Sequence, residues 1–283
     1  MGEHTMHAAE ERTAQPDAPD ERWSTALTSI APNAIMVRGY HLDELMGRLS
    51  FPDAVYLLLM GELPTRTIGR MLDAIFVSVI DHGVTPPSTL AARNVAASGA
   101  PIKDAVAAGI LGFGPYHGGD IETCMRFLDQ GLSLTRGGWS TQKAAQKLVD
   151  DWAQANTTPP PGFGHRLHTQ DPRAPRLFQL ATELELEGEH VWMLRALERA
   201  LGEREEHFGR LLPANVDGAI AAISADLGFS YELGNAIFLI SRLPGLIAHA
   251  HEERMRQEPM RRIDPKDHVY DGSRARRLPE GRK

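Results

Sequence analysis

Apolar residues recur along most of the chain at the spacing of an α-helix. In the segment 65–83, Ile68, Met71, Leu72 and Ile75 lie three or four positions apart, which puts them on one helix face. The pattern predicts an amphipathic helix that buries this stripe against a core and ends near residue 81.

The same periodicity continues to residue 253 and predicts a largely helical protein. Ser50 stands at an N-cap position and Pro52 follows near the first helical position, a combination typical of a helix start. The predicted helices cover residues 50–64, 65–81, 88–100, 102–114, 121–134, 140–155, 173–186, 191–209, 216–228 and 231–253.

Only the segment 23–42 shows a different pattern. It alternates loosely and carries β-branched residues, with Pro32 and Asn33 as a turn signal between two short extended stretches. The fold class expected is therefore mainly all-α, with a short β segment near the N-terminus.

Composition then excludes several classes of protein. The net charge is −7 and no basic stripe with interleaved aromatics occurs, which argues against nucleic-acid binding. A single cysteine, Cys124, rules out an intramolecular disulfide and suits a reducing compartment. The polar segment 1–22 has no apolar signal-peptide core and is expected to be disordered, and no apolar run is expected to reach membrane-spanning length. We expect a soluble cytoplasmic protein.

Four short stretches place a titratable residue beside glycines or a helix start. They are "DHG" at His82, "GPYHGGD" at His117, "GFGHR" at His165 and "LPANVDG" at Asp217. Glycine permits a positive φ and a close approach of ligand, and histidine is the usual acid or base near neutral pH. The stretches are far apart in sequence, so only the fold could bring them together.

No zinc spacing, phosphate-binding loop, nucleophile elbow or glycine-rich dinucleotide turn is found. Acid/base chemistry by histidines and one aspartate remains, without a metal or a covalent nucleophile, and this suits proton abstraction beside a carbonyl. The alternative for any one histidine is a structural role. His249 and His251, two positions apart on a predicted helix, are a poor metal pair, and a packing or surface role is expected for them.

An ordered set of motifs resembles the citrate synthase superfamily. "VRGYHLDELMGRLSFPDAVYLLLMGELPT", "GPYHGGD", "GFGHRLHTQDPRA", "LPANVDGAI" and "AIFLISRLPGLIAHAHEE" occur in the family's order. The resemblance runs from Trp23 to Gly272. In length, and in "DHGVTPPST" and "PMRRIDPKDHVYDG", the chain looks more like citryl-CoA lyase and the lyase module of ATP-citrate lyase.

The resemblance implies a helical homodimer whose smaller domain closes over the substrates. It divides the chain into a tail (1–22), a discontinuous large domain (23–117 and 218–283) and a small domain (118–217). The implied substrates are a coenzyme A thioester and oxaloacetate or citrate, and no tightly bound cofactor is expected.

The resemblance also implies roles for individual residues. Asp217 matches the base that removes a proton from the methyl of the acetyl thioester. His117 matches the donor to the thioester oxygen, and His165 the group that protonates the oxaloacetate carbonyl. His82, Arg173 and Arg242 match carboxylate-binding residues. Coenzyme A binding is assigned to Pro161, Gly162, Gly164 and Asn215.

The chain departs from the family pattern in three places. Glu258 stands where an arginine usually reaches the neighbouring subunit's citrate, and Arg261 and Arg262 are the candidates to substitute for it. Asp120 replaces an alanine in "HGGD". The spacing from His165 to Arg173 is one residue shorter than in many synthases.

These features lead to three hypotheses. The first is a citryl-CoA lyase-type enzyme that interconverts citryl-CoA with acetyl-CoA and oxaloacetate. The second is a short citrate or 2-methylcitrate synthase, which condenses and then hydrolyses. The third is a non-catalytic homologue that binds acyl-CoA.

Overall fold

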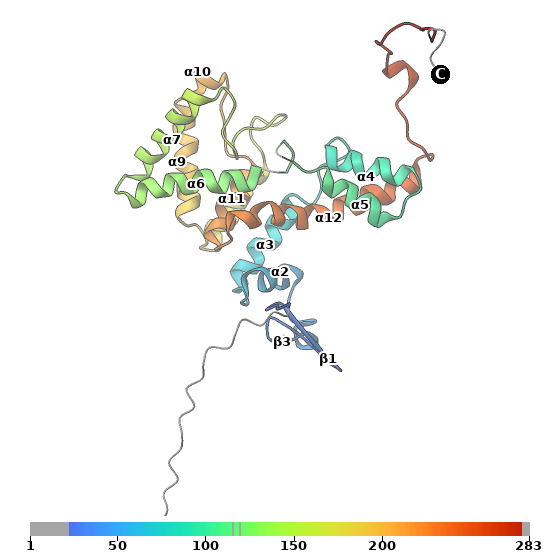
Figure 1. Cartoon of the computed structure of the whole chain (residues 1–283). Helices are drawn as coiled ribbons and strands as arrows, with labels where there is room; N and C mark the ends of the chain where they lie inside the picture. The colour runs from blue at the N-terminus through green and yellow to red at the C-terminus, as the bar shows by residue number, and fades with distance from the viewer. Residues whose placement is uncertain (1–22, 115, 119, 279–283) are drawn as a thin grey trace, which may run out of the picture.

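The computed structural model describes residues 23–114, 116–118 and 120–278, and the predicted tail 1–22 lies outside these residues. The strands are β1 (Thr28–Ala31), β2 (Ala34–Val37) and β3 (Tyr40–His41), paired antiparallel in the order β1-β2-β3. Asn33 has a φ of 61° in the turn between β1 and β2, where the sequence predicted a turn. Helices make up most of the remainder, as expected (Figure 1).

The described helices follow the predicted order. They are α1 (Leu42–Leu45), α2 (Phe51–Met60), α3 (Arg66–Ser78), α4 (Pro87–Ala97), α5 (Ile102–Leu111), α6 (Asp120–Arg136), α7 (Thr141–Ala155), α8 (Arg173–Glu183), α9 (Glu189–Gly202), α10 (Glu205–Phe208), α11 (Val216–Asp226) and α12 (Tyr231–Arg256), with a 3₁₀ turn at Pro265–Asp267.

Helix starts were predicted to within two residues, but several helix ends were wrong by three residues or more. Ser50 accepts a hydrogen bond from the Asp53 backbone N–H, and Asp53 accepts one from Ser50, which forms a capping box at the start of α2. Helix α3 was expected to reach residue 81 but ends at Ser78. The residues that follow instead turn toward α12, where Arg242 Nε donates to the Val79 carbonyl at 2.8 Å.

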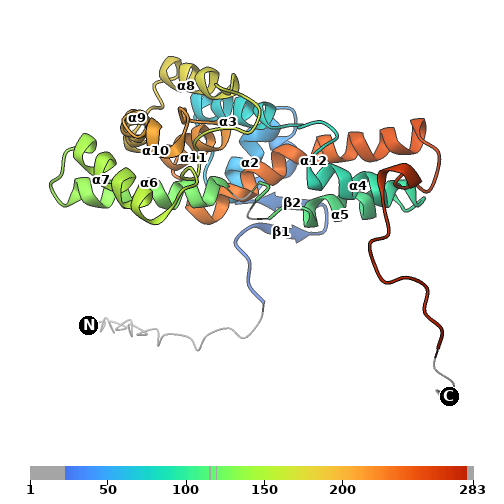
Figure 2. The same cartoon turned by 90° about the horizontal axis from the view of Figure 1, so that it is seen from above.

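Helix α12 connects the two ends of the molecule. It packs against α6, α3 and α11 at one end and against α4 and α5 at the other. Figures 1 and 2 both show α4, α5 and the C-terminal part of α12 extending as an arm away from α6, α7 and α9. Ala96, Ala105 and Ala250 form a small separate core inside this arm, so the three helices can approach closely.

A large hydrophobic core lies under α2, α3, α6, α7, α8, α9, α11 and α12. Helix α11 packs against α6, α8 and α9, which are the helices of the predicted small domain. The division of the chain at residues 118 and 217 stays a prediction.

The sequence predicted no apolar run of membrane-spanning length, and by length and composition this prediction is wrong for α12. The helix has 26 residues, and its best window has a mean hydropathy of 1.2. Of that window, 44% is buried inside the fold. One helix that meets these two criteria is weak evidence for a membrane span, because the core helix of a soluble protein meets them too, and α12 packs against α3, α4, α5 and α6.

Candidate functional site

Most of the predicted site residues line one cavity of about 100 Å³. Most of these residues lie in loops or at helix starts: the loop after α3, the segment before α6, the loop between α7 and α8, and the starts of α8 and α11. Arg242 and Phe238 lie instead in the middle of α12. The predicted residues that line the cavity are His82, His117, His165, Arg173, Asn215, Asp217 and Arg242, together with Val79, Gly118, Val216 and Phe238.

His117 is held as a neutral ring. Burial, with Arg242 and His82 nearby, lowers the pKa of His117 to about 4. Its Nε2 lies 2.7 Å from Ser88 Oγ, and its ring stacks on Phe113 with centroids 4.9 Å apart. No pattern in the sequence pointed to Ser88, which is fully buried in the first turn of α4 and reaches His117 only through the tertiary fold.

His165 is fixed in one tautomer when neutral. Its Nδ1 accepts hydrogen bonds from the backbone N–H groups of Leu167 and His168, both at 3.0 Å. Since Nδ1 is an acceptor, the proton of the neutral ring is on Nε2, which is then a hydrogen-bond donor. Burial and the neighbouring His168 lower the pKa of His165, which favours this neutral form.

Asp217 lies in the first turn of α11, just after the N-cap Asn215. Burial and the nearby carboxyl of Asp120 raise the pKa of Asp217 to about 6, against the opposing effect of Arg173 and Arg242. A carboxylate with a pKa near the working pH is suited to act as a general base. Asp120, which the sequence marked only as a departure, therefore contributes to the electrostatics of the site.

Arg242 brings a buried positive charge to the cavity. Only 2% of the residue is exposed; its Nε donates to Val79 and its guanidinium lies 4.7 Å from the Phe238 ring centroid. Its Nη1 is buried without a hydrogen-bond partner among the described residues. A buried cation with an unused donor is costly unless an anion binds it, so this atom marks an anion-binding position.

Asp171 orients Arg173, a role that the sequence did not assign. Its carboxylate is 1% exposed and accepts from Arg173 Nε and Nη2, both at 2.9 Å, and from the Val216 backbone N–H at 3.1 Å. The first residue of "DPR" was interpreted only as part of a helix start. In the structure Asp171 links the start of α8 to the start of α11. It also occupies two of the hydrogen-bond donors of the Arg173 guanidinium, Nε and Nη2.

Of the residues predicted to bind coenzyme A, only Asn215 lines the cavity. Gly162 and Gly164 have φ values of 85° and 73°, and a Cβ on Gly162 would lie 2.5 Å from Cys124 Sγ. Pro161, Gly162 and Gly164 are not among the residues that line the cavity. Asn215 ties them to α11: its side chain caps Gly218 N–H and donates to the Gly164 carbonyl at 2.8 Å.

Arg261, one of the two candidates to replace the arginine absent at position 258, is already paired within its own chain. Arg261 binds the buried Glu253 through Nε and Nη2, both at 2.7 Å, and Glu253 also binds Arg93. Arg261 is therefore engaged within its own chain, which leaves Arg262 as the remaining candidate of the two.

The fold of this chain is similar to those of known proteins. A citryl-CoA lyase structure from Hydrogenobacter thermophilus superposes with a TM-score of 0.83 and 42% identity, over 91% of this chain and 98% of that chain. ATP citrate lyase from Methanosaeta concilii, a D541A mutant in complex with (3S)-citryl-CoA, gives a TM-score of 0.72 over 91% of this chain and 43% of its own. At 19% identity, that likeness shows the fold alone.

Curated relatives are citrate synthases. The glyoxysomal enzyme of Cucurbita maxima is 30% identical over 215 residues, which cover 74% of this chain and 39% of the relative. Citrate synthase 1 of Mycobacterium tuberculosis is 29% identical over 209 residues, 72% of this chain and 46% of the relative. The chain thus spans less than half the length of these relatives.

A family model described as "Citrate synthase, C-terminal domain" matches residues 65–264, which include every residue that lines the cavity. The family and the helical fold expected from the motifs are confirmed: this chain belongs to the citrate synthase family.

Proposed function

We propose that this protein is a citryl-CoA lyase-type enzyme, which reversibly cleaves citryl-CoA to acetyl-CoA and oxaloacetate. The observation that carries the proposal is the unpartnered Nη1 of buried Arg242, in the same cavity as His117, His165 and Asp217. An anion bound at Arg242 would lie beside three acid/base groups, which is the arrangement that a carboxylate-bearing carbonyl substrate requires.

In the condensation direction, Asp217 takes a proton from the methyl of acetyl-CoA. We assign the donor proton of His117 to Nδ1, because Ser88 Oγ–H can donate to Nε2, and Nδ1–H then stabilises the enolate oxygen. The methyl carbon attacks the oxaloacetate carbonyl carbon, and His165 Nε2 gives its proton to the carbonyl oxygen. His165 Nδ1 takes up a proton from solvent in exchange, so the ring stays neutral, and the hydrogen bonds from Leu167 and His168 to Nδ1 are released in this step. Arg242, Arg173 and His82 bind the carboxylates.

Cleavage reverses each of these steps. The citryl hydroxyl gives up its proton, the carbon–carbon bond breaks, oxaloacetate leaves as the ketone, and the enolate takes the proton of Asp217. His165 can accept the hydroxyl proton only if Nε2 is unprotonated. The hydrogen bonds from Leu167 and His168 to Nδ1 must therefore be released on this path.

One comparison favours the lyase over a synthase. The likeness to the Hydrogenobacter thermophilus citryl-CoA lyase covers almost the whole of both chains, at 42% identity, against 30% and 29% for the two synthase relatives described above. A short citrate or 2-methylcitrate synthase is the second candidate, supported by those sequence relatives. A non-catalytic acyl-CoA-binding homologue is the third.

One assay separates the three candidates. Supply of acetyl-CoA and oxaloacetate, with free thiol followed continuously, gives steady thiol release from a synthase and none from a lyase. Supplied citryl-CoA is cleaved rapidly by the lyase to acetyl-CoA and oxaloacetate. If neither assay shows turnover but calorimetry still detects acyl-CoA binding, the protein is the non-catalytic acyl-CoA-binding homologue.

The pH dependence of condensation should follow the ionisation of Asp217. We expect the kcat/KM of condensation to rise between pH 5 and pH 7 with a midpoint near 6, because Asp217 with a pKa of about 6 must lose its proton to act as a base. His117, with a pKa of about 4, stays neutral throughout. A midpoint below pH 4.5 would argue against Asp217 as the base.

Coenzyme A binding is assigned to the loop at Pro161, Gly162 and Gly164. Its backbone, fixed by Asn215 against α11, presents a rigid edge next to Asp217. We assign the adenine to this edge and the thioester to the cavity, without a tightly bound cofactor.

We also propose a homodimer through the arm formed by α4, α5 and α12. Large apolar side chains are exposed there, which is unusual for a monomer surface: Leu90, Ile110, Leu111, Leu243 and Ile247. Light scattering should give twice the mass of the 31.1 kDa chain. Leu111→Glu, at a position that is 85% exposed, should reduce the dimer fraction, and a monomer mass for the parent protein would refute the dimer.

A further inference from the structure

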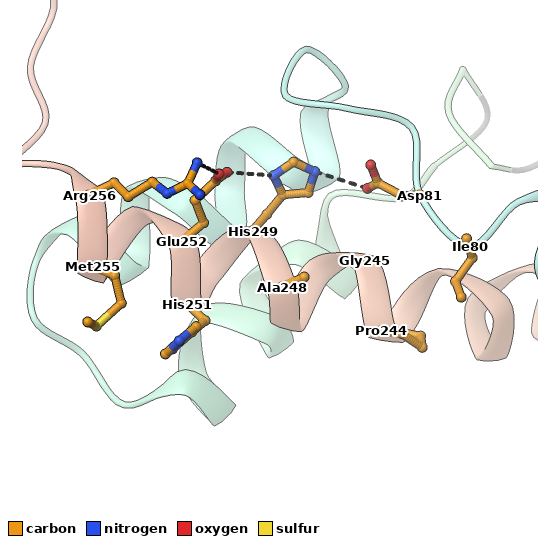
Figure 3. A pocket seen from close by; sticks show the side chains of 10 residues that line it. All are labelled: Ile80, Asp81, Pro244, Gly245, Ala248, His249, His251, Glu252, Met255 and Arg256. Atoms are coloured by element: carbon orange, nitrogen blue, oxygen red, sulfur yellow. Dashed lines mark hydrogen bonds and ion pairs between the residues drawn. The ribbon is translucent and has the colours of Figure 1, made fainter.

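A second cavity, of about 630 Å³, lies on the side of α12 reached by Ile80 and Asp81 (Figure 3). A row of polar side chains crosses its upper edge in the view, from Asp81 through His249 and Glu252 to Arg256. His249 Nε2 lies 3.0 Å from Asp81 Oδ1, and His249 Nδ1 lies 3.8 Å from Glu252 Oε2. His249 is thus placed between two carboxylates, with 12% of its side chain exposed.

One face of α12 binds the backbone that follows α3. Arg242 Nε holds the Val79 carbonyl at 2.8 Å. Gly245, the next residue along this face, allows close contact, since a Cβ there would lie 2.5 Å from the Ile80 carbonyl oxygen. Two turns beyond Arg242, His249 holds the Asp81 carboxylate. These contacts fasten residues 79–81 to α12 at three successive points.

Asp81 links His249 to the backbone turn that carries His82. Its Oδ2 accepts the Gly83 backbone N–H at 3.0 Å, while Oδ1 meets His249. Burial alone would raise the pKa of Asp81, but the Gly83 and His82 backbone hydrogen bonds, together with His249, lower it. The carboxylate is therefore ionised and closes the turn that carries His82 into the substrate cavity.

The loop between α3 and α4 has no regular secondary structure of its own. The position of His82 relative to Arg242 then depends on the Asp81–His249 bond, since Arg242 and His249 both belong to α12. A hydrogen bond to an ionised group is worth more than a neutral one, and of the three contacts that hold residues 79–81 this is the one nearest to His82 in sequence.

We propose that His249 is a positioning residue for His82: through Asp81 it sets the distance between His82 and Arg242 and so the affinity for the oxaloacetate half of the substrate. The proposal rests on the proposed function, in which His82 and Arg242 bind the carboxylates. It gives His249, expected from the sequence to have a packing or surface role, an indirect part in substrate binding.

Replacement of His249 tests the proposal. His249→Ala should raise the calorimetric Kd for oxaloacetate, and its KM, about tenfold or more, with kcat changed less than about threefold. His249→Gln should restore most of the affinity, because its amide nitrogen can occupy the place of Nε2 and donate to Asp81. His251→Ala is the matched control: it lies on the same helix, is exposed and should leave both constants unchanged.

A readout without substrate separates this proposal from the proposed function. In the free protein labelled on its histidine rings, the His82 signal, assigned with His82→Gln, should shift in His249→Ala and return toward its parent position in His249→Gln. If the parent binds no oxaloacetate but the signal follows this order, the proposed function fails and the positioning role stands.

Two outcomes would overturn the positioning role. One is an unchanged His82 signal and Kd in folded His249→Ala. The other is an equal loss in the Ala and Gln variants, which would mean that the Asp81 bond is not responsible. Should His249→Ala fail to fold, Asp81→Asn weakens the same bond with little change in shape. It should then raise the Kd for oxaloacetate and shift the His82 signal, as expected of His249→Ala, and an unchanged Kd and signal in Asp81→Asn would overturn the positioning role.

Discussion

Asp217→Asn is expected to lower kcat at least about 10³-fold in both directions, while the protein becomes more stable above pH 6. The amide cannot take the methyl proton, and general-base contributions reach about 10² to 10⁴. Burial of the carboxyl raises its pKa to about 6, from the ordinary value of 3.8, so the folded state is destabilised by the charged form.

The sign of the stability change follows from linkage. Stability contributed by the protonated carboxyl is present below pH 3.8 and is lost as the pH rises through about 6. The Asp217→Asn variant has no ionisable group at this position and would not undergo this loss. The Tm difference between variant and parent should therefore grow from pH 5 to pH 7 and reach at least about 2 °C, measured by calorimetry.

The matched control for this substitution is Asp104→Asn. Asp104 also lies in the first turn of a helix, α5, and it does not line the cavity. Its replacement should leave kcat unchanged and cost roughly a few tenths of a kcal/mol, through the lost interaction with the helix dipole. Wild-type turnover in Asp217→Asn would show that the proton goes to another group.

His117→Gln should lower kcat about 10² to 10³-fold, because a donor to the enolate oxygen is lost or displaced. Ser88→Ala should give a smaller loss, about tenfold, since the ring remains but Nε2 loses the hydroxyl at 2.7 Å that fixes its tautomer. Steady-state kinetics of condensation measure both effects.

The neighbour of Ser88 supplies the control. Thr89 is also fully buried on α4, and its hydroxyl has no hydrogen-bond partner among the described residues. Thr89→Val removes the hydroxyl without removing such a bond and should keep normal turnover. Equal losses in Ser88→Ala and Thr89→Val would assign the Ser88 effect to packing of α4 rather than to His117.

Local signals in the sequence account for much of the fold. The capping box at Ser50 and Asp53, the turn at Asn33, and the apolar periodicity of α3 each depend on residues a few positions apart, so they could be predicted. The end of α3 could not. It ends at Ser78 because α12, far along the chain, binds residues 79–81, and periodicity contains no information about that contact.

The candidate site shows the same division. His117, His165 and Asp217 were found because each lies in a stretch with unusual neighbours and family-like motifs. Ser88, Asp171 and His249 were not assigned roles in the site, because serine on a helix, aspartate before a proline and histidine on a helix are common. Ser88 and His249 act on partners 29 and 168 positions away, and Asp171 holds Arg173 against the start of α11, 45 positions on, which only the tertiary structure reveals.

The sequence by itself determined the helical class, the family and the identity of most groups in the cavity, because propensity, periodicity and motif order are local properties. The tertiary structure decided their chemical states. The desolvation that raises the pKa of Asp217 and lowers that of His117, the tautomer of neutral His165 and the unpartnered donor of Arg242 all depend on which atoms surround each group, and that is fixed only when distant segments pack together.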